Sequence, residues 1–217
     1  MKNQLEERTA YLRESYKAHV EATTKLVEAD GGRIFGVDLV VWAVLNRSLS
    51  LLEGFTMMIE AKNILCAGSL LRLQIDSLMR LYACWLVENP HTIVEPLLKG
   101  EPLSLIKSKT GNSLTDRYLH TELSSVYPWV DSVYEATSGF IHLSKVHMVS
   151  IVNCHDVTTD KFSFGLGDSA RAVKEEELLE AVDGFTEATK CLLHLSMSWL
   201  TTKEKAALGR VGAKERM

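Results

Sequence analysis

Residues that interrupt helices are scarce in this sequence. Among 217 residues there are only 4 prolines and 13 glycines, and these two residue types cost the most stability inside a helix. Their scarcity favours long helices over the many turns of an all-β protein. Hydrophobic residues form 46% of the chain, which is enough for a packed core and excludes wholesale disorder.

Long hydrophobic runs without charge are also absent. The two most hydrophobic segments, residues 37–58 and 63–87, both contain charged residues near their centres. Charged side chains are costly inside a bilayer, so we expect no membrane span. Residues 1–19 are charged and lack the hydrophobic centre of a signal peptide, and we therefore expect a cytoplasmic protein.

Motifs for metal or nucleotide binding are missing as well. No HExxH motif occurs among the 7 histidines, and the spacing of His142 and His147 does not place them on one helix face. Gly165-Leu166-Gly167 lacks the rest of a phosphate-binding fingerprint. The 4 cysteines have no close spacing. We therefore expect no metal site, no cofactor and reduced cysteines.

A strong excess of one charge is lacking too. The net charge is −4 and the isoelectric point about 6.0. Extensive DNA binding requires a broad basic surface, so we exclude it. RNA or a small anionic ligand remains open, because either could bind at a local basic site.

What the sequence does contain is helical periodicity. Hydrophobic residues recur at three- and four-residue spacing over five long segments, which are residues 4–29, 37–61, 63–87, 113–143 and 172–200. Pro128 interrupts the fourth segment, which is therefore either one helix or two pieces. Residues 146–167 are instead rich in β-branched residues and then alternate in polarity, which predicts a hairpin turning near residues 157–161. The predicted fold is all-α: a helical bundle of about five long helices with one small β-hairpin insertion. We expect one domain over residues 1–201 and a flexible C-terminal tail over residues 202–217.

Proline interrupts the chain mainly after the third helix. Pro90, Pro96 and Pro102 lie in or beside residues 91–112, where we expect a connector with a short helix at residues 92–98. This connector is either a plain linker or a mobile gate over a site.

A polar seam crosses the third helix. Arg72, Asp76 and Arg80 follow one another at four-residue spacing, with Ser69 beside them, so all four lie on one face. Because the rest of this helix is hydrophobic, we expect Asp76 to bridge the two arginines in a dry setting, where Asp76→Ala costs about 3 kcal/mol. The seam is either a structural ion-pair ladder or a ligand or catalytic pocket.

A second polar strip lies on the fourth helix. Tyr134, Ser138 and His142 share one face at four-residue spacing. His142 is near the end of the helix, where it acts either as a general acid or base or as a favourable charge at the helix C-terminus. If the two strips meet across the bundle, they form one ligand-binding site, comprising Ser69, Arg72, Asp76, Arg80, Tyr134, Ser138 and His142.

The text SLLRLQIDSLMRLYACWL, preceded by a helix pair and followed by YEATSGFIHLS, resembles a bacterial family of helical proteins of unknown function near the HEPN and abortive-infection families. The resemblance covers roughly residues 45–150. It implies a helical bundle, frequent dimerisation and, in the catalytic HEPN members, metal-independent RNA cleavage by an arginine followed four to six residues later by a histidine. No arginine stands at that spacing before His142. Our hypothesis for a catalytic pair is therefore His142 with Arg72, which would take the place of the missing arginine in space.

Three functions of different classes follow from these observations. The first is a HEPN-like homodimer with a degenerate active site, linked to RNA metabolism or phage defence. The second is a module that binds a small anion or a partner's carboxylate at the Arg72–Asp76–Arg80 seam. The third is a dimeric scaffold in which the seam is purely structural.

Overall fold

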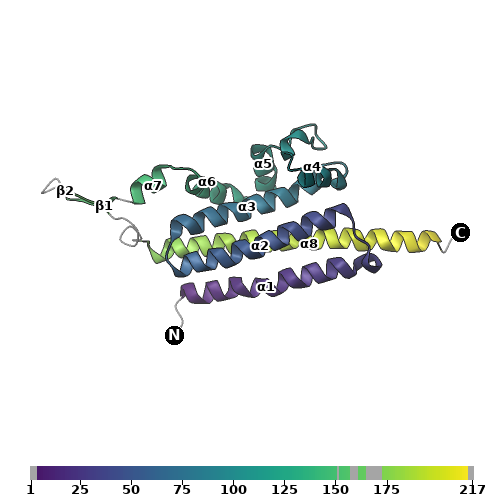
Figure 1. Ribbon diagram of the computed structural model, residues 1–217, viewed down its shortest axis with the longest axis horizontal. Helices are drawn as coiled ribbons and strands as arrows, with labels where there is room; N and C mark the ends of the chain where they lie inside the picture. The colour runs from purple at the N-terminus through teal and green to yellow at the C-terminus, as the bar shows by residue number, and fades with distance from the viewer. Residues whose placement is uncertain (1–3, 151, 157–160, 165–172, 215–217) are drawn as a thin grey trace.

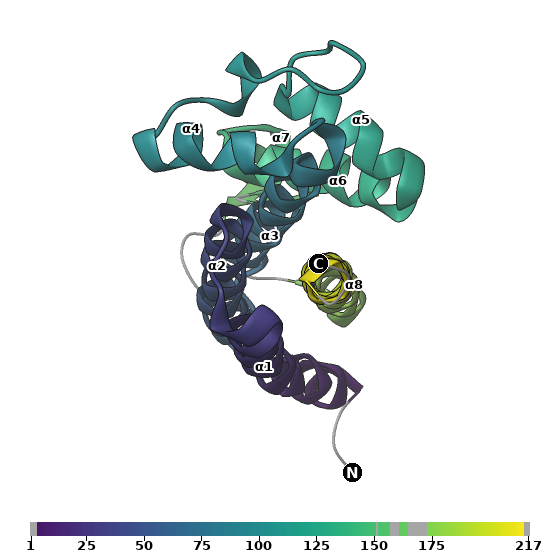
Figure 2. The ribbon, with the colours of Figure 1, turned by 90° about the vertical axis from the view of Figure 1, so that its right-hand side faces the viewer.

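Four long helices form the body of the protein. The computed structural model describes residues 4–150, 152–156, 161–164 and 173–214. Helices α1 (Gln4–Glu28), α2 (Gly36–Glu60), α3 (Ile64–Leu86) and α8 (Glu175–Lys214) run side by side (Figure 1). Viewed along the bundle, α1, α2 and α3 form an arc, and α8 lies on its inner side against α1 and α3 (Figure 2). The predicted all-α character is confirmed. About five long helices were expected, but the segment 113–143 is divided at Pro128 into two shorter helices.

Local signals begin and end α1, α2 and α3 where the sequence predicts. After α1, Asp30 and Gly31 have positive φ angles of 57° and 64°, in a short 3-10 turn, η1 (Ala29–Gly32), that reverses the chain. At the start of α2, the Phe35 backbone N–H donates to Asp38 Oδ2 at 2.8 Å. Asn63 caps α3 by accepting a hydrogen bond from the Cys66 backbone N–H.

Shorter elements cover the other side of α3. They are η2 (Pro90–Ile93), α4 (Val94–Lys99), η3 (Leu103–Leu105), α5 (Asp116–Val126), α6 (Trp129–Ile141) and α7 (Lys145–Ser150). Helices α5 and α6 pack directly on α3. The connector contains a short helix, as predicted, and its Ile93 and Leu103 are buried. These two anchors favour the linker interpretation over the mobile gate.

Two short strands follow α7. Strand β1 (Val152–Asp156) pairs antiparallel with β2 (Lys161–Phe164), and Cys154 lies opposite Ser163. The strands lie beyond one end of the bundle (Figure 1). The expected hairpin began at residue 146, but residues 145–150 form helix α7, so that boundary was wrong. The turn predicted near residues 157–161 lies mostly outside the described residues, and the hairpin as a unit stays a prediction.

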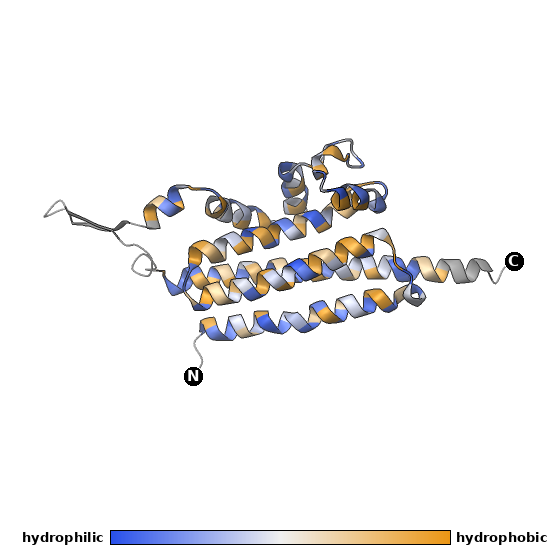
Figure 3. Ribbon diagram, in the orientation of Figure 1, coloured by the Kyte–Doolittle hydropathy of each residue, from blue (hydrophilic) through white to orange (hydrophobic). Residues whose placement is uncertain are grey.

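The core lies between the four long helices. Hydrophobic residues are more frequent along α2 and α3 than along α1 (Figure 3), in keeping with the larger number of neighbours around α3. At its centre, the rings of Phe55 and Phe185 stack with centroids 4.3 Å apart, and both side chains are fully buried. Burial of each contributes about 1.5–3 kcal/mol to stability. Among the described helices, none is long and hydrophobic enough to cross a membrane.

A buried ion pair joins α2 to α8. Lys203 Nζ lies 2.9 Å from Asp38 Oδ2, and both side chains are 0% exposed. Lys203 also donates to the Leu26 carbonyl oxygen, and Trp199 Nε1 donates to Asp38 Oδ1 at 2.6 Å. The expected end of the last helix near residue 200 was therefore wrong, because α8 continues to Lys214 and Lys203 belongs to the core. A charged residue cannot be recognised as buried until its partner is known.

Candidate functional site

The polar seam on α3 has a different partner from the one expected. Asp76 accepts hydrogen bonds from Arg47 of α2 at 2.9 Å and from Arg80 at 3.2 Å, and not from Arg72. Arg80 also reaches Asp116 at the start of α5, at 2.5 Å. The prediction that Asp76 bridges Arg72 and Arg80 is therefore correct for Arg80 and wrong for Arg72.

The seam is also wetter than expected. The exposed fraction of the side chain is 20% for Asp76, 26% for Arg80 and 41% for Arg47. Ion pairs with this much exposure are screened by water. The expectation of a dry seam was wrong because α2 and α5 flank the ladder without covering it.

Arg72 forms a separate cluster with α6 and α5. Its guanidinium carbon lies 4.0 Å from the centre of the Tyr134 ring, and the His120 ring lies 4.1 Å from the same centre. His120 Nε2 is 3.3 Å from an Asp131 carboxylate oxygen, but the geometry is not that of a hydrogen bond. The two predicted strips therefore meet at one point, Arg72 on Tyr134.

The other predicted site residues do not join this cluster. The Ser69 hydroxyl lies 3.0 Å from the Phe140 carbonyl oxygen, and the Ser138 hydroxyl donates to the Tyr134 carbonyl oxygen at 2.6 Å. His142 caps the end of α6 and is exposed. It follows Tyr134 by eight residues, about 12 Å along a helix. The structure thus places Arg72 and His142 apart, and the expected ligand site falls into three separate places.

A buried polar network lies inside the bundle, and sequence reasoning missed it. His19 Nε2 lies 2.9 Å from the Ser48 hydroxyl, and the Gln74 side-chain amide donates to Ser48 and to Thr189. Burial lowers the pKa of His19 below its ordinary value, so the imidazole is neutral at pH 7. The network joins α1, α2, α3 and α8 by hydrogen bonds within the core.

The buried thiols are not candidates for nucleophilic chemistry. Burial raises the pKa of Cys84 to about 12 and that of Cys191 to about 11. Because the thiolate is the reactive species, both side chains are inert at neutral pH.

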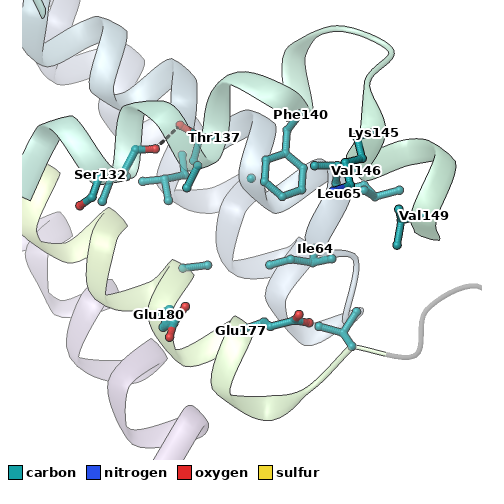
Figure 4. Close-up of a pocket in the computed structure, with 16 residues that line it drawn as sticks. Ile64, Leu65, Ser132, Thr137, Phe140, Lys145, Val146, Val149, Glu177 and Glu180 are labelled. Carbon is teal, nitrogen blue, oxygen red and sulfur yellow. Dashed lines mark hydrogen bonds between the residues drawn. The ribbon is translucent and has the colours of Figure 1, made fainter.

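An apolar pocket with a volume of about 870 Å³ lies between α3, α6, α7 and the start of α8 (Figure 4). Its walls are mostly apolar, and they comprise Ile64, Leu65, Gly68, Leu71, Ser132, Val133, Ala136, Thr137, Phe140, Lys145, Val146, Val149, Val173, Glu177, Glu180 and Ala181. None of these residues was expected to form a site, because each has the character of an ordinary core or surface position in its own helix.

The pocket lies where α6 and α8, which both pack along α3, diverge from each other. They come close at Gly184, where an added Cβ would lie 3.4 Å from Leu71 and 3.7 Å from Val133. Towards α7 the two helices separate, and the pocket opens between them. At its floor, an added Cβ on Gly68 would lie only 2.7 Å from the Phe140 ring, so glycine is required for α6 to approach α3 this closely.

Charged groups lie at the mouth of this pocket. Glu177 accepts a hydrogen bond from the Lys174 backbone N–H and caps α8. Within the part of the chain that the structure describes, Glu180 and Lys145 have no ion-pair partner. In Figure 4 the two glutamates extend from α8 on one side of the pocket and Lys145 lies on the other.

No family model, curated protein or solved structure matches this chain. The resemblance to the HEPN and abortive-infection families therefore stays a prediction, and function has to be argued from the geometry.

The described residues contain no group of side chains that suits a metal ion. Within residues 4–150, 152–156, 161–164 and 173–214, no three His, Cys, Asp or Glu side chains gather closely enough to hold an ion. The chemistry that the pocket offers is enclosure of an apolar group beside carboxylates.

Proposed function

We propose that this protein is a binding module that encloses the apolar part of a small molecule in the pocket between α3, α6 and α8. The proposal rests on the pocket's size and lining. A volume of about 870 Å³ lies within the range of sites for small organic ligands, which are concave and mostly apolar.

The shape of the pocket favours a compact ligand over a long peptide helix. A bound helix is about 10 Å wide and needs a groove open at both ends. Here the approach of α8 to Val133 and Leu71 at Gly184 closes one end. A ligand enters from the α7 side and places its apolar end towards Gly184.

Octan-1-ol tests this function, because it offers an apolar chain without charge. We expect isothermal titration calorimetry to detect one saturable site per chain. Ala136→Trp, which places an indole on the pocket wall, should abolish binding, whereas Ala43→Trp on the exposed face of α2 should not. Equal binding by both variants, or no binding by the wild type, would contradict the proposal.

Arg72 supports a second candidate, the anion-binding module. Its guanidinium stacks on Tyr134 and has no carboxylate partner among the described residues, unlike Arg47 and Arg80. A guanidinium fork that is oriented but unpaired suits a carboxylate or phosphate group.

NMR signals of the arginine side chains test whether Arg72 binds an anion. Addition of inorganic phosphate should shift the Arg72 Nε–H signal in a saturable way, and Arg72→Lys should weaken binding about tenfold because lysine lacks the fork. The exposed Arg33 serves as the matched control. Equal shifts at Arg72 and Arg33 would indicate only general ionic screening.

A further inference from the structure

We infer that the ligand of the apolar pocket carries a positive charge, held at the α8 side of the mouth by Glu180. This inference rests on the proposed binding function and adds the chemical class of the ligand: an amphiphile with an apolar body and an ammonium-type group.

The inference rests on the distribution of charge at the mouth of the pocket. Glu175, Glu176, Glu177 and Glu180 lie within two turns at the start of α8, and the described cations nearby are Lys145 and Lys174. Among the described residues that line the pocket, the two carboxylates of Glu177 and Glu180 therefore outnumber the single ammonium of Lys145. The excess lies on the α8 wall, while Lys145 stands on the opposite wall (Figure 4).

Among these carboxylates, Glu180 is the best placed to contact a ligand. Glu175 and Glu176 are not part of the lining, and Glu177 is engaged in the cap of α8. Glu180 lines the pocket without a partner among the residues that the structure describes. It lies four residues before Gly184, about 6 Å along the helix from the closed end.

The depth of the pocket fits a chain of moderate length. Glu177 and Gly184 are separated by seven residues, which corresponds to about 10 Å of helix. An apolar chain of that length reaches the closed end while its charged group stays at the rim, where water and the carboxylates solvate it. Complete burial of the charge is not required, so the desolvation cost stays small.

Three probes of equal length separate the charge preference from the apolar fit. Octylammonium, octan-1-ol and nonanoate carry the same eight-carbon apolar chain and differ only in the head group, and all three can be titrated calorimetrically into the intact chain. We expect affinity to fall in that order, with about a tenfold difference between octylammonium and nonanoate. The preference should shrink as salt is added, because the carboxylates are exposed.

The variant Glu180→Gln tests whether the Glu180 carboxylate causes the preference for a cationic probe. This variant should bind octylammonium about threefold more weakly and octan-1-ol unchanged, and Glu14→Gln on the exposed face of α1 is the matched control. If all three probes bind equally, or nonanoate binds best, the charge inference is overturned while the pocket function stands. If no probe binds, both fail.

Discussion

At the scale of single residues, two aspartates of similar sequence character have different environments. Asp38 and Lys203 are completely buried against each other, whereas Asp76 is 20% exposed and lies between two partly exposed arginines. Removal of one partner of an ion pair costs more stability when the remaining charge is shielded from water. The two aspartates are therefore expected to contribute differently to the stability of the fold.

Asp38→Ala should therefore be far more damaging than Asp76→Ala. We expect the first substitution to cost about 3–5 kcal/mol, because it leaves the Lys203 ammonium buried without its counter-charge. The second should cost about 1 kcal/mol, since Arg47 and Arg80 remain solvated. Urea unfolding of both variants measures the difference, and equal midpoints would contradict it.

His19 should make the protein sensitive to mild acid. Its pKa is lowered in the folded state by burial, whereas in the unfolded chain it stays near 6.5. Below that value the unfolded chain binds a proton that the folded chain does not, so stability is present above about pH 6.5 and is lost as the pH falls towards the lowered value. The loss can reach about 1.4 kcal/mol per pH unit.

The variant His19→Gln isolates the contribution of this residue, because glutamine has no side chain that titrates in this pH range. Unfolding midpoints measured between about pH 7.5 and pH 5.5 should fall more steeply for the wild type than for the variant. Parallel curves would mean that His19 is protonated equally in both states.

At the scale of elements, α8 is longer and more deeply involved in the core than its sequence indicated. The four long helices could be predicted because their hydrophobic spacing is local. The role of residues 201–208 could not, because Lys203 is separated from Asp38 by 165 residues. The position of a partner so far along the chain is fixed only by the packing of α2 against α8.

Truncation should show this dependence directly. Removal of residues 201–217 should destabilise the protein by at least about 3 kcal/mol, because it leaves Asp38 without its partner. Removal of residues 209–217 should have little effect, since Leu208 is already 73% exposed. The two truncations and full-length Lys203→Met can be compared by thermal unfolding. If the chain that lacks residues 201–217 were as stable as the full-length protein, α8 would end functionally near residue 200.

The candidate site was predictable only in part, for a similar reason. The sequence placed Arg72 and Tyr134 on two polar strips that could meet across the bundle, because each lies on a regular helical face, and these two residues are in contact. Arg47 interrupts the hydrophobic face of the second helix, which left two positions open for it, an interface or the seam. The structure places it at the seam, but its replacement of Arg72 as the partner of Asp76 could not be predicted. The pocket was missed altogether, since it arises from the angle between α6 and α8 and not from any residue pattern.

At the scale of the whole molecule, hydrophobic side chains remain exposed at the end that carries α7. Ile141, Leu143, Met148 and Val149 have exposed fractions of 42%, 84%, 59% and 57%. Such a patch favours association, and we expect a homodimer at micromolar concentration. Light scattering should give about twice 24.3 kDa, and Leu143→Glu should shift the mass towards a monomer. A wild-type mass near 24.3 kDa would contradict this expectation.

Ribonuclease activity of the HEPN type is not expected from this geometry. Arg72 is held against Tyr134, about 12 Å along α6 from His142, so the two cannot act on one phosphate within a single chain. Purified protein should show little or no cleavage of single-stranded RNA in the presence of a chelator. Clear cleavage that is lost in both His142→Ala and Arg72→Ala would support the enzyme instead.

The pairing of Asp38 with Lys203 also bears on how the protein is made. The ribosome releases α1, α2 and α3 long before α8, so Asp38 emerges while its only buried counter-charge among the described residues is still unsynthesised. Until then, the inner side of the arc formed by the first three helices has no cover (Figure 2), and its hydrophobic residues are open to chaperones or to neighbouring nascent chains. Translation of α8 at least as far as Lys203 therefore precedes the step that completes the bundle.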